Sequence, residues 1–387
     1  MSRGVYLLQF GDFRQLSKAE AYAFVIQHQL KPVHEDLSYM IVESPKRIDL
    51  QFGSILRVAE YYSDIEGFAD LFSDDLSYFG DKIEWSVIFF HECSQESERL
   101  RQQILSLIKK FNKKSIYINP TSLFSKQGGI SLTRAIRKNL AAEGFEFVLS
   151  RWDNKIVVWR TIKHLDLQGF RERDLARPYK NPLISMPPWL ARSMINMASP
   201  SLGAKLLDPF CGTGTILIEA VDSGLNAYGV DLDPHNVNGS RENLNWFQIK
   251  KKKATSLVIL ADSRHLDEHF PEDYFDLAVT EPPFGPPFNK SVKINEVRAI
   301  ASRLSELYIR VFNSLSKVLK KGGVVVFTLP SWRLKSGGLY ELRVEDILGK
   351  SGLEPEKRIG NAILPIRWSK PDNIIQRVIN VARKPSS

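Results

Sequence analysis

Residues 205–220, KLLDPFCGTGTILIEA, set the strongest limit on the architecture of this chain. A short apolar strand is expected to end at Asp208, Gly212 and Gly214 fall in the turn after it, and a helix-forming run follows. Glycine lets a backbone bend sharply and approach a ligand closely, so this turn suits a cofactor bound beyond the ends of parallel strands. The turn lacks the GxGxxG spacing of dinucleotide-binding folds.

Strand-like and helix-like segments alternate from this turn to the C-terminus. The later strand-like segments are NAYGVDLD, SLVILAD, FDLAVTEPP and GGVVVFTLP, and helical segments such as PHNVNGSRENLNWF and SRLSELYIRVFNSLSKVL separate them. Apolar strands separated by amphipathic helices predict a parallel, doubly wound sheet, and therefore an α/β fold.

The first half of the chain mixes strands and helices in another order. Residues 1–50 predict a small α/β unit, and the acidic, aromatic stretch 53–80 predicts its closing part or a connector. The pattern then predicts strands at 83–90 and 115–119, helices at 97–112 and 131–144, and a strand pair at 145–150 and 155–162 that turns at Asp153-Asn154. A polar connector rich in Arg and Pro is expected at 163–185.

Positive charge is concentrated in the middle of the chain. The 387 residues carry a formal net charge of +9, but residues 1–100 hold 9 Lys/Arg against 17 Asp/Glu, whereas residues 101–180 hold 17 against 6. Polyanions are bound mainly by Lys and Arg, so the basic segment is a candidate phosphate-binding surface. A well-solvated basic face without a ligand is the alternative.

Composition excludes several classes of protein. With only two cysteines, Cys93 and Cys211, a disulfide framework and a cysteine-rich metal site are excluded, and the histidines show no metal-ligand spacing. No apolar run approaches the roughly 20 residues that span a bilayer, and the N-terminus has no secretory pattern. We therefore expect no metal, no membrane association and a cytoplasmic location.

The segment DPFCGTGT resembles the first motif of S-adenosylmethionine-dependent methyltransferases that act on amino groups. Asp231 and Asp262 are expected at the ends of the next two strands, where one carboxylate can accept the ribose hydroxyls and the other the adenine amino group. Each aspartate alone could equally cap the following helix. Their succession after the glycine turn favours a cofactor crevice.

The fourth strand ends in EPPFG, where amino methyltransferases carry Asp or Asn, two prolines and then Tyr or Phe. An exocyclic base amine becomes nucleophilic only when acceptors hold its N–H groups and direct the nitrogen towards the methyl group. A carboxylate and a neighbouring backbone carbonyl, fixed in direction by the prolines, serve as acceptors, and the aromatic ring stacks on the base. Here the acidic residue is Glu281, which is one methylene longer than aspartate, followed by Pro282, Pro283 and Phe284.

Taken together with the preceding sequence, these motifs resemble the THUMP-domain tRNA guanosine-N2 methyltransferases of the archaeal and eukaryotic guanosine-10 type. The similarity includes the opening YLLQFGDFRQLSKAEAYAF, the segment 83–165, FRERDLARPYKNPLISMPPWLARSMINMA and the final LPIRWSKPDNIIQRVINVARK. The resemblance implies a ferredoxin-like unit at 1–80, a THUMP RNA-binding domain at 81–165, a linker at 166–185 and a Rossmann-like methyltransferase domain at 186–387. An antiparallel strand pair is expected from RIGNAILP and IIQRVINVAR.

The resemblance also implies a set of site residues. It assigns catalysis to the EPPF residues and binding of S-adenosyl-L-methionine to Asp208, Pro209, Phe210, Cys211, Gly212, Thr213, Gly214, Thr215, Asp231, Leu232, Asp262 and Ser263. Cys211 is expected to be a small packed residue rather than a nucleophile. The helix expected at 186–198 would pack beside the methionine end of the cofactor or serve simply as a core helix.

RNA contacts are expected from basic side chains in two places. Candidates for the tRNA face of the THUMP domain are Lys113, Lys114, Lys126, Arg134, Arg137 and Lys138. In the linker, Arg171, Arg173, Arg177 and Lys180 either contact phosphates near the active site or form salt bridges.

The resulting hypothesis is methylation of the N2 amine of a tRNA guanosine, with the THUMP domain docking the tRNA 3′ end. One alternative is a DNA adenine or cytosine amino methyltransferase, although no separate base-reading domain is visible. The other is a catalytically inactive tRNA-binding paralogue, supported mainly by glutamate at position 281. Some members of the family need a small zinc-containing partner protein, and we expect a monomer acting alone.

Overall fold

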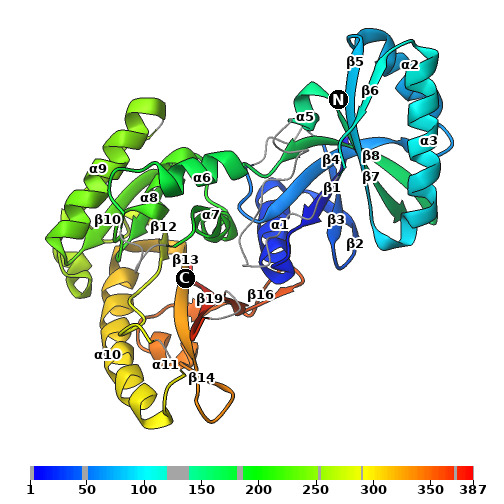
Figure 1. Cartoon of the computed structure of the whole chain (residues 1–387). Helices are drawn as coiled ribbons and strands as arrows, with labels where there is room; N and C mark the ends of the chain where they lie inside the picture. The colour runs from blue at the N-terminus through cyan, green and yellow to red at the C-terminus, as the bar shows by residue number, and fades with distance from the viewer. Residues whose placement is uncertain are drawn as a thin grey trace. The chain divides into compact units, whose positions relative to one another are not determined.

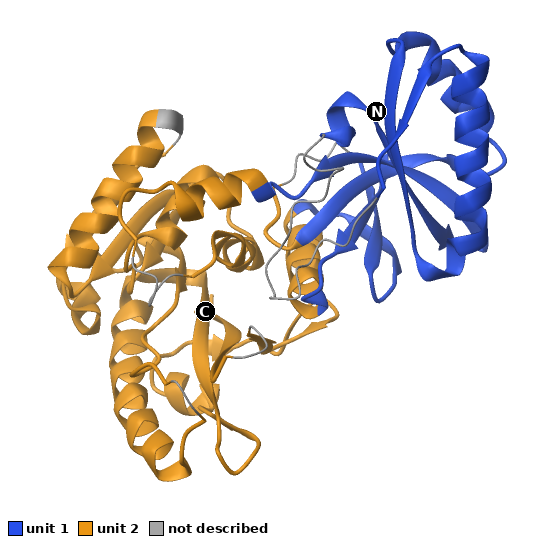
Figure 2. Ribbon diagram, in the orientation of Figure 1, with its two compact units in different colours: residues 1–14, 28–50, 55–167 blue, residues 15–27, 51–54, 168–387 orange. Residues whose placement is uncertain are grey.

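The computed structural model describes residues 4–45, 51–119, 139–180, 186–251, 254–288, 291–369 and 373–386. The chain divides into two compact units, which Figure 2 colours separately. Unit 1 comprises residues 1–14, 28–50 and 55–167, and unit 2 comprises residues 15–27, 51–54 and 168–387. None of the helices in the described ranges is long and apolar enough to cross a membrane.

Unit 1 is built on one eight-stranded sheet with the order β2-β3-β1-β4-β8-β7-β5-β6. Its strands are β1 (Gly4–Phe10), β2 (Lys31–Glu35), β3 (Tyr39–Ser44), β4 (Ile55–Asp64), β5 (Lys82–Phe89), β6 (Lys114–Tyr117), β7 (Phe145–Trp152) and β8 (Lys155–His164). Because β4 pairs with β8, the sheet runs continuously through the expected boundary at residue 80. The stretch 53–80, expected as a closing part or connector, thus supplies a central strand and helix α2 (Phe68–Tyr78).

The helix and hairpin predicted in the basic segment are confirmed. Helix α3 (Ser94–Lys110) follows a short 3₁₀ turn (His91–Cys93) and buries Leu100, Ile104 and Ile108 against α2 and the sheet. Asp153 and Asn154 both have positive φ, at 50° and 59°. Two such residues form the tight turn whose twist matches a hairpin, here between β7 and β8. The expected helix at 131–144 lies mostly outside the described residues, which contain only α5 (Leu140–Glu143) of it.

Unit 2 contains the predicted doubly wound sheet, of which Figure 1 labels β10, β12, β13 and β19. The strand order is β11-β10-β9-β12-β13-β19-β15. Strands β9 (Lys205–Asp208), β10 (Asn226–Asp231), β11 (Ser256–Leu260), β12 (Phe275–Thr280) and β13 (Leu319–Arg333) are parallel. The connecting helices are α8 (Thr215–Asp222), α9 (Pro234–Lys251), a 3₁₀ segment (Ser263–Glu268) and α10 (Ile294–Val318). Helices α1 (Arg14–His28), α6 (Leu167–Leu175), α7 (Pro188–Met197) and α11 (Val344–Leu348) complete the helices described in this part of the chain.

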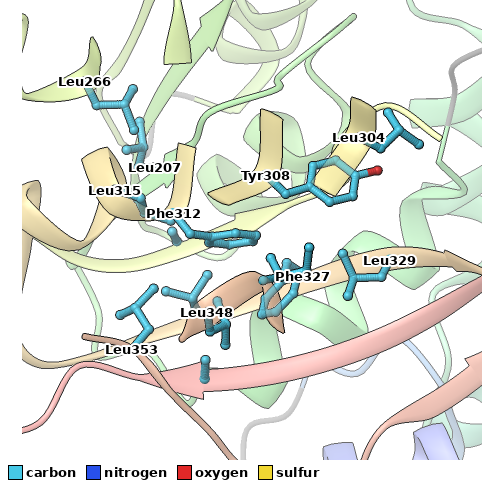
Figure 3. Packing of buried hydrophobic residues seen from close by; sticks show 14 of the residues in the cluster. Leu207, Leu266, Leu304, Tyr308, Phe312, Leu315, Phe327, Leu329, Leu348 and Leu353 are labelled. Carbon is cyan, nitrogen blue, oxygen red and sulfur yellow. The ribbon is translucent and has the colours of Figure 1, made fainter. Parts of the chain in front are cut away.

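An apolar core of unit 2 lies between α10 and the sheet. Tyr308, Phe312 and Leu315 of α10 are buried against Phe327 and Leu329 of β13, as Figure 3 shows. Positions 308, 312 and 315 are spaced four and three residues apart, so they share one face of the helix. Burying this face holds α10 beside the loop that follows β12.

The C-terminal strands only partly match the expectation. IIQRVINVAR forms β19 (Ile375–Arg383), which pairs antiparallel with β13, as predicted. RIGNAILP does not join the main sheet, because β16 (Arg358–Ile359) and β17 (Ala362–Ile363) pair only with each other in the described structure. The short strands β15 (Glu354–Pro355) and β18 (Ile366–Trp368) pair with β19 instead, and β14 (Leu339–Glu341) pairs with β13.

Candidate active site

The predicted motifs meet where the order of the parallel strands reverses. Strand β9 leads first to β10 on one side, and β12 later occupies its other side. Ligands of open α/β sheets bind beyond the carboxyl ends of the strands at such a point. Asp208 ends β9 and Glu281 directly follows β12, so the structure places the first and last predicted motifs on adjacent strand ends.

The glycine turn is a tightly constrained cradle. Gly212 and Gly214 have φ values of 49° and 83°, in the left-handed region that favours glycine. A Cβ atom on Gly214 would lie 2.5 Å from the hydroxyl of Ser240. The amide of Gly212 donates to Oδ2 of Asp231 at 2.9 Å, which ties the turn to the end of β10. The two predicted cofactor elements are therefore one hydrogen-bonded unit.

Asp208 is buried beneath this turn, with 1% of its surface exposed. Its Oδ1 accepts a hydrogen bond from the Thr280 hydroxyl at 2.8 Å and another from the amide of Phe210 at 3.1 Å. Burial raises the pKa of Asp208 to about 7; these two bonds oppose the rise, and the charges of Asp231 and Glu281 add to it. A carboxyl in this state is poised to change charge near neutral pH when a cation approaches.

Asp231 presents a carboxylate at the end of β10. Its Oδ1 accepts the amide of Asp233 at 2.9 Å and the side-chain amide of Asn236 at 3.2 Å. A carboxylate offers about four acceptor sites, so it can bind further donors. The next residue, Leu232, is 68% exposed, which is unusual for a leucine and provides an apolar surface at the predicted cofactor position.

Asp262 and Ser263 lie at the end of β11, as predicted. The Asp262 carboxylate accepts the Arg264 amide at 3.0 Å and pairs with the Arg264 guanidinium at 2.9 Å. These hydrogen bonds lower the pKa of Asp262. The Ser263 hydroxyl donates to the carbonyl of Pro209, so it supports the glycine turn from the neighbouring strand.

Cys211 is a packed residue within the turn, as predicted. Its side chain is buried against the backbone of Gly229, whose added Cβ would lie 3.0 Å from the Cys211 sulfur. Burial, with the nearby charges of Asp208 and Asp231, raises the pKa of the thiol well above its usual value. A protonated, buried thiol is a poor nucleophile.

The loop after β12 is anchored from helix α10. The Tyr308 hydroxyl donates to the carbonyl of Pro283, and the tyrosine is otherwise buried in the core. No hydrogen bond within the described part of the chain engages the carbonyl of Pro282. The anchoring of one proline carbonyl leaves the other as the backbone acceptor next to Glu281.

Glu281 is engaged by Arg377, a residue that the sequence analysis missed. The guanidinium binds both carboxylate oxygens, with Nε to Oε2 at 2.5 Å and Nη2 to Oε1 at 2.8 Å. Its carbon also lies 5.7 Å from the ring centroid of Phe284. Arg377 is 96 positions from Glu281 in the chain, and only the pairing of β19 with β13 brings them together.

Two of the linker arginines are buried, which corrects the prediction that they contact RNA phosphates. Arg173 is 4% exposed, and its Nε donates to Glu219 of α8 at 2.5 Å. Arg177 is 3% exposed and donates to the Thr215 hydroxyl at 2.6 Å. The salt-bridge alternative holds for Arg173, because a guanidinium this deeply buried cannot reach a phosphate. The connector also contains helix α6, so it is not an irregular linker throughout.

The other predicted RNA contacts differ in their surroundings. Lys114 and Lys180 are exposed, whereas Nζ of Lys113 donates to the carbonyls of Phe79 and Gly80. Lys126, Arg134, Arg137 and Lys138 lie outside the described residues.

Helix α7 is a core helix. Its buried residues include Leu190, Met194 and Ile195. Its Arg192 Nη2 joins Glu219 at 2.8 Å and Asp222 at 2.7 Å in the ion-pair cluster that also holds Arg173. The helix behind the glycine turn is therefore fixed by charges from both α6 and α7.

Comparison with known proteins identifies a methyltransferase domain that contains the predicted motifs. Residues 177–335 match the UPF0020 family, described as an RMKL-like methyltransferase domain. A tRNA (guanine(10)-N2)-dimethyltransferase of Methanothermobacter thermautotrophicus is 26% identical over 298 residues, covering 76% of this chain and 78% of that protein. A probable tRNA (guanine(10)-N2)-dimethyltransferase of Methanothermococcus thermolithotrophicus is 34% identical over 145 residues, covering 36% of this chain and 77% of that protein.

The fold also has a counterpart among solved structures. The crystal structure of TrmN from Thermus thermophilus aligns with 98% of this chain and 99% of its own, with a TM-score of 0.50 and 15% identity. At that identity the likeness concerns the fold, which is that of a Rossmann-like methyltransferase with additional N-terminal structure.

Proposed function

This chain belongs to the tRNA guanine-N2-methyltransferase family, and from that premise we propose that it methylates the N2 amine of a guanosine in tRNA. Relatives named for guanine 10 support that position as the target. The observation that carries the proposal is the placement of Asp208 and Glu281 at the ends of the adjacent strands β9 and β12, where Thr280, the residue before Glu281, donates its hydroxyl to Asp208. An acceptor for the target amine and a cofactor turn then share one crevice. We infer no DNA substrate, because the named relatives act on RNA.

The residues present fit S-adenosylmethionine. The positive φ at Gly212 and Gly214 gives a turn that a ligand can approach closely, and the Asp231 carboxylate with exposed Leu232 offers a polar and an apolar surface beside it. The buried carboxyl of Asp208 would complement a positively charged ligand. When bound, S-adenosylmethionine supplies the methyl group as an electrophile.

The protein's own contribution to the reaction is orientation. Glu281 and the carbonyl of Pro282 would accept the two N–H groups of the guanine amine, which directs the nitrogen lone pair out of the ring. Phe284 would stack on the base. Holding the amine in line with the methyl group turns an encounter of two molecules into an intramolecular displacement, and this accounts for most of the acceleration.

The direct test is methyl transfer from labelled S-adenosylmethionine to unmodified tRNA, followed by nucleoside analysis of the digest. We expect N2-methylguanosine, and dimethylguanosine at longer times if the enzyme acts twice. Glu281→Gln should lower kcat strongly while leaving cofactor affinity within about twofold, because only the transition state needs the carboxylate. Unchanged methylation by Glu281→Ala would remove this residue from the mechanism. Cofactor binding without product would favour a tRNA-binding protein that has lost its activity.

We further propose that unit 1 docks the tRNA, as the basic segment 101–180 and the resemblance to THUMP enzymes suggest. Replacing the exposed Lys109, Lys110 and Lys114 of unit 1 by glutamate should then weaken tRNA binding while leaving cofactor binding unchanged. Unchanged tRNA affinity of this variant would refute the docking role.

We also propose a cytoplasmic monomer that acts alone. The two free thiols, Cys93 and Cys211, suit a reducing compartment. A zinc-containing partner is the alternative, and the sheet edge at β11 with exposed Leu257 and Leu260 offers a surface for one. Sedimentation of the pure protein and an assay without added proteins separate the two.

A further inference from the structure

Glu281 does not stand free in its loop but is held by an arginine from the last strand of the sheet. Arg377 uses two nitrogens to bind two carboxylate oxygens, a bidentate contact that fixes direction as well as distance. Their side chains are only 16% and 15% exposed, respectively, so water screens the contact little. The Thr328 hydroxyl of β13 approaches Oε2 at 3.5 Å from a third direction.

Arg377 is itself fixed by aromatic rings. Its guanidinium carbon lies 5.0 Å from the ring centroid of Trp368 and 5.7 Å from that of Phe284. Cations are attracted to aromatic faces at distances of up to about 6 Å. Trp368 in turn meets Trp189 of α7 edge to face, with centroids 5.7 Å apart. One side chain therefore contacts both the amine acceptor and the ring that would stack on the base.

The length of the glutamate matters for this contact. An aspartate at position 281 would hold its carboxylate one methylene closer to the backbone, so the contact with both guanidinium nitrogens depends on the longer side chain of glutamate. Glutamate also has one more rotatable bond than aspartate. Without the arginine, its carboxylate would therefore be less well positioned. Arg377 thus fixes the position of the Glu281 carboxylate, which remains the hydrogen-bond acceptor.

We propose that Arg377 is a positioning residue that sets the Glu281 carboxylate for the target amine and so lets glutamate take the place of the shorter acid. This inference rests on the proposed function. A carboxylate has about four acceptor sites, and Arg377 uses one on each oxygen, so sites remain for an N–H group of the substrate.

The test compares Arg377→Met with a matched control, Arg367→Met. Arg367 lies on the neighbouring strand β18 and makes the same bidentate contact, to Glu341 at 2.7 Å and 2.8 Å, away from the EPPF loop. We expect Arg377→Met to lower kcat for tRNA methylation by roughly 10- to 100-fold, the range that small misplacements of reacting groups cause. Cofactor affinity and the KM for tRNA should stay within about twofold, and Arg367→Met should change none of the three.

Two further variants separate positioning from folding. Arg377→Lys keeps the positive charge but loses the planar, bidentate guanidinium, so its kcat should also fall. It replaces Arg377→Met in the comparison if Arg377→Met unfolds below the assay temperature. In Arg377→Ala, added guanidinium at millimolar concentration should restore part of kcat, which a purely structural defect would not show. In a Glu281→Gln background, Arg377→Met should change kcat by less than about threefold, because the charged pair is already gone.

The outcomes distinguish this inference from the function on which it rests. Wild-type protein that forms no N2-methylguanosine would remove the proposed function and the inference together. The inference would be overturned if Arg377→Met had the kcat of wild type, or if the Arg367→Met control lost as much kcat as Arg377→Met. Either result would leave the proposed function unchanged.

Discussion

Replacing Asp208 by asparagine should stabilise the protein at alkaline pH. The pKa of this buried carboxyl is raised to about 7 from 3.8, so the folded state holds a proton over a pH range in which the unfolded chain has lost it. Unfolding free energy therefore falls as pH rises from about 4 to about 7, by at most about 4 kcal/mol. Asparagine does not ionise, and its side-chain oxygen can keep the bonds from Thr280 and Phe210.

The expected magnitude is measurable by thermal unfolding. At pH 8 the midpoint of Asp208→Asn should exceed that of wild type by up to roughly 8–16 °C, at about 2–4 °C per kcal/mol for a domain of this size. The difference should become small near pH 4 and vanish near pH 3, where the carboxyl is protonated in both the folded and the unfolded wild type. Cofactor affinity should fall in the variant, because the ionised carboxylate favours a cation.

Asp276, near the start of the neighbouring strand β12, is the matched control. Burial acts to raise the pKa of Asp276, but its ion pair with Lys320 and the bond from the Lys205 amide leave that pKa lowered. A lowered carboxyl pKa contributes stability above the unfolded pKa, which is lost as pH falls through the folded value. Asp276→Asn should therefore destabilise at pH 8. Equal stabilities of Asp208→Asn and wild type at pH 8, or a less stable variant, would refute the reasoning.

Three other predictions concern the buried partner of two arginines, the hydrogen bond of Tyr308 and the basic segment 101–180. Glu219→Gln should lower the unfolding free energy by about 3–5 kcal/mol, because it removes the negative charge that pairs with two buried arginines. Denaturant titration measures this loss, and a change below about 1 kcal/mol would contradict the prediction. Tyr308→Phe removes the bond to the Pro283 carbonyl, so kcat should fall several-fold with cofactor affinity unchanged in equilibrium binding, whereas an unchanged kcat would show that the core alone holds the loop. Affinity for tRNA should fall steeply with salt through counterion release from residues 101–180, and a flat response in filter binding would exclude that surface.

The family and the doubly wound sheet could be predicted from the sequence because both depend on short, continuous stretches of it. The glycine turn, the strand before it and the helix after it occupy 18 consecutive residues, 205–222, and local backbone sterics favour glycine in the turn. Asp231 and Glu281 could be located because each directly ends an apolar strand. Parallel strands bring their carboxyl ends to one edge of the sheet whatever the loops between them contain.

The sequence alone determined the architecture, the cofactor class and the acceptor loop, while the tertiary structure decided which charges serve the site. Arg173 and Arg177 look like surface arginines in a polar linker, yet both are buried. Arg377 looks like one charge in a C-terminal strand, yet it holds Glu281. The role of a charge depends on its partner and its burial. For Arg377 these depend on the pairing of β19 with β13, and for Arg173 and Arg177 they depend on contacts with α8, 46 and 38 residues away. No local sequence pattern records such contacts.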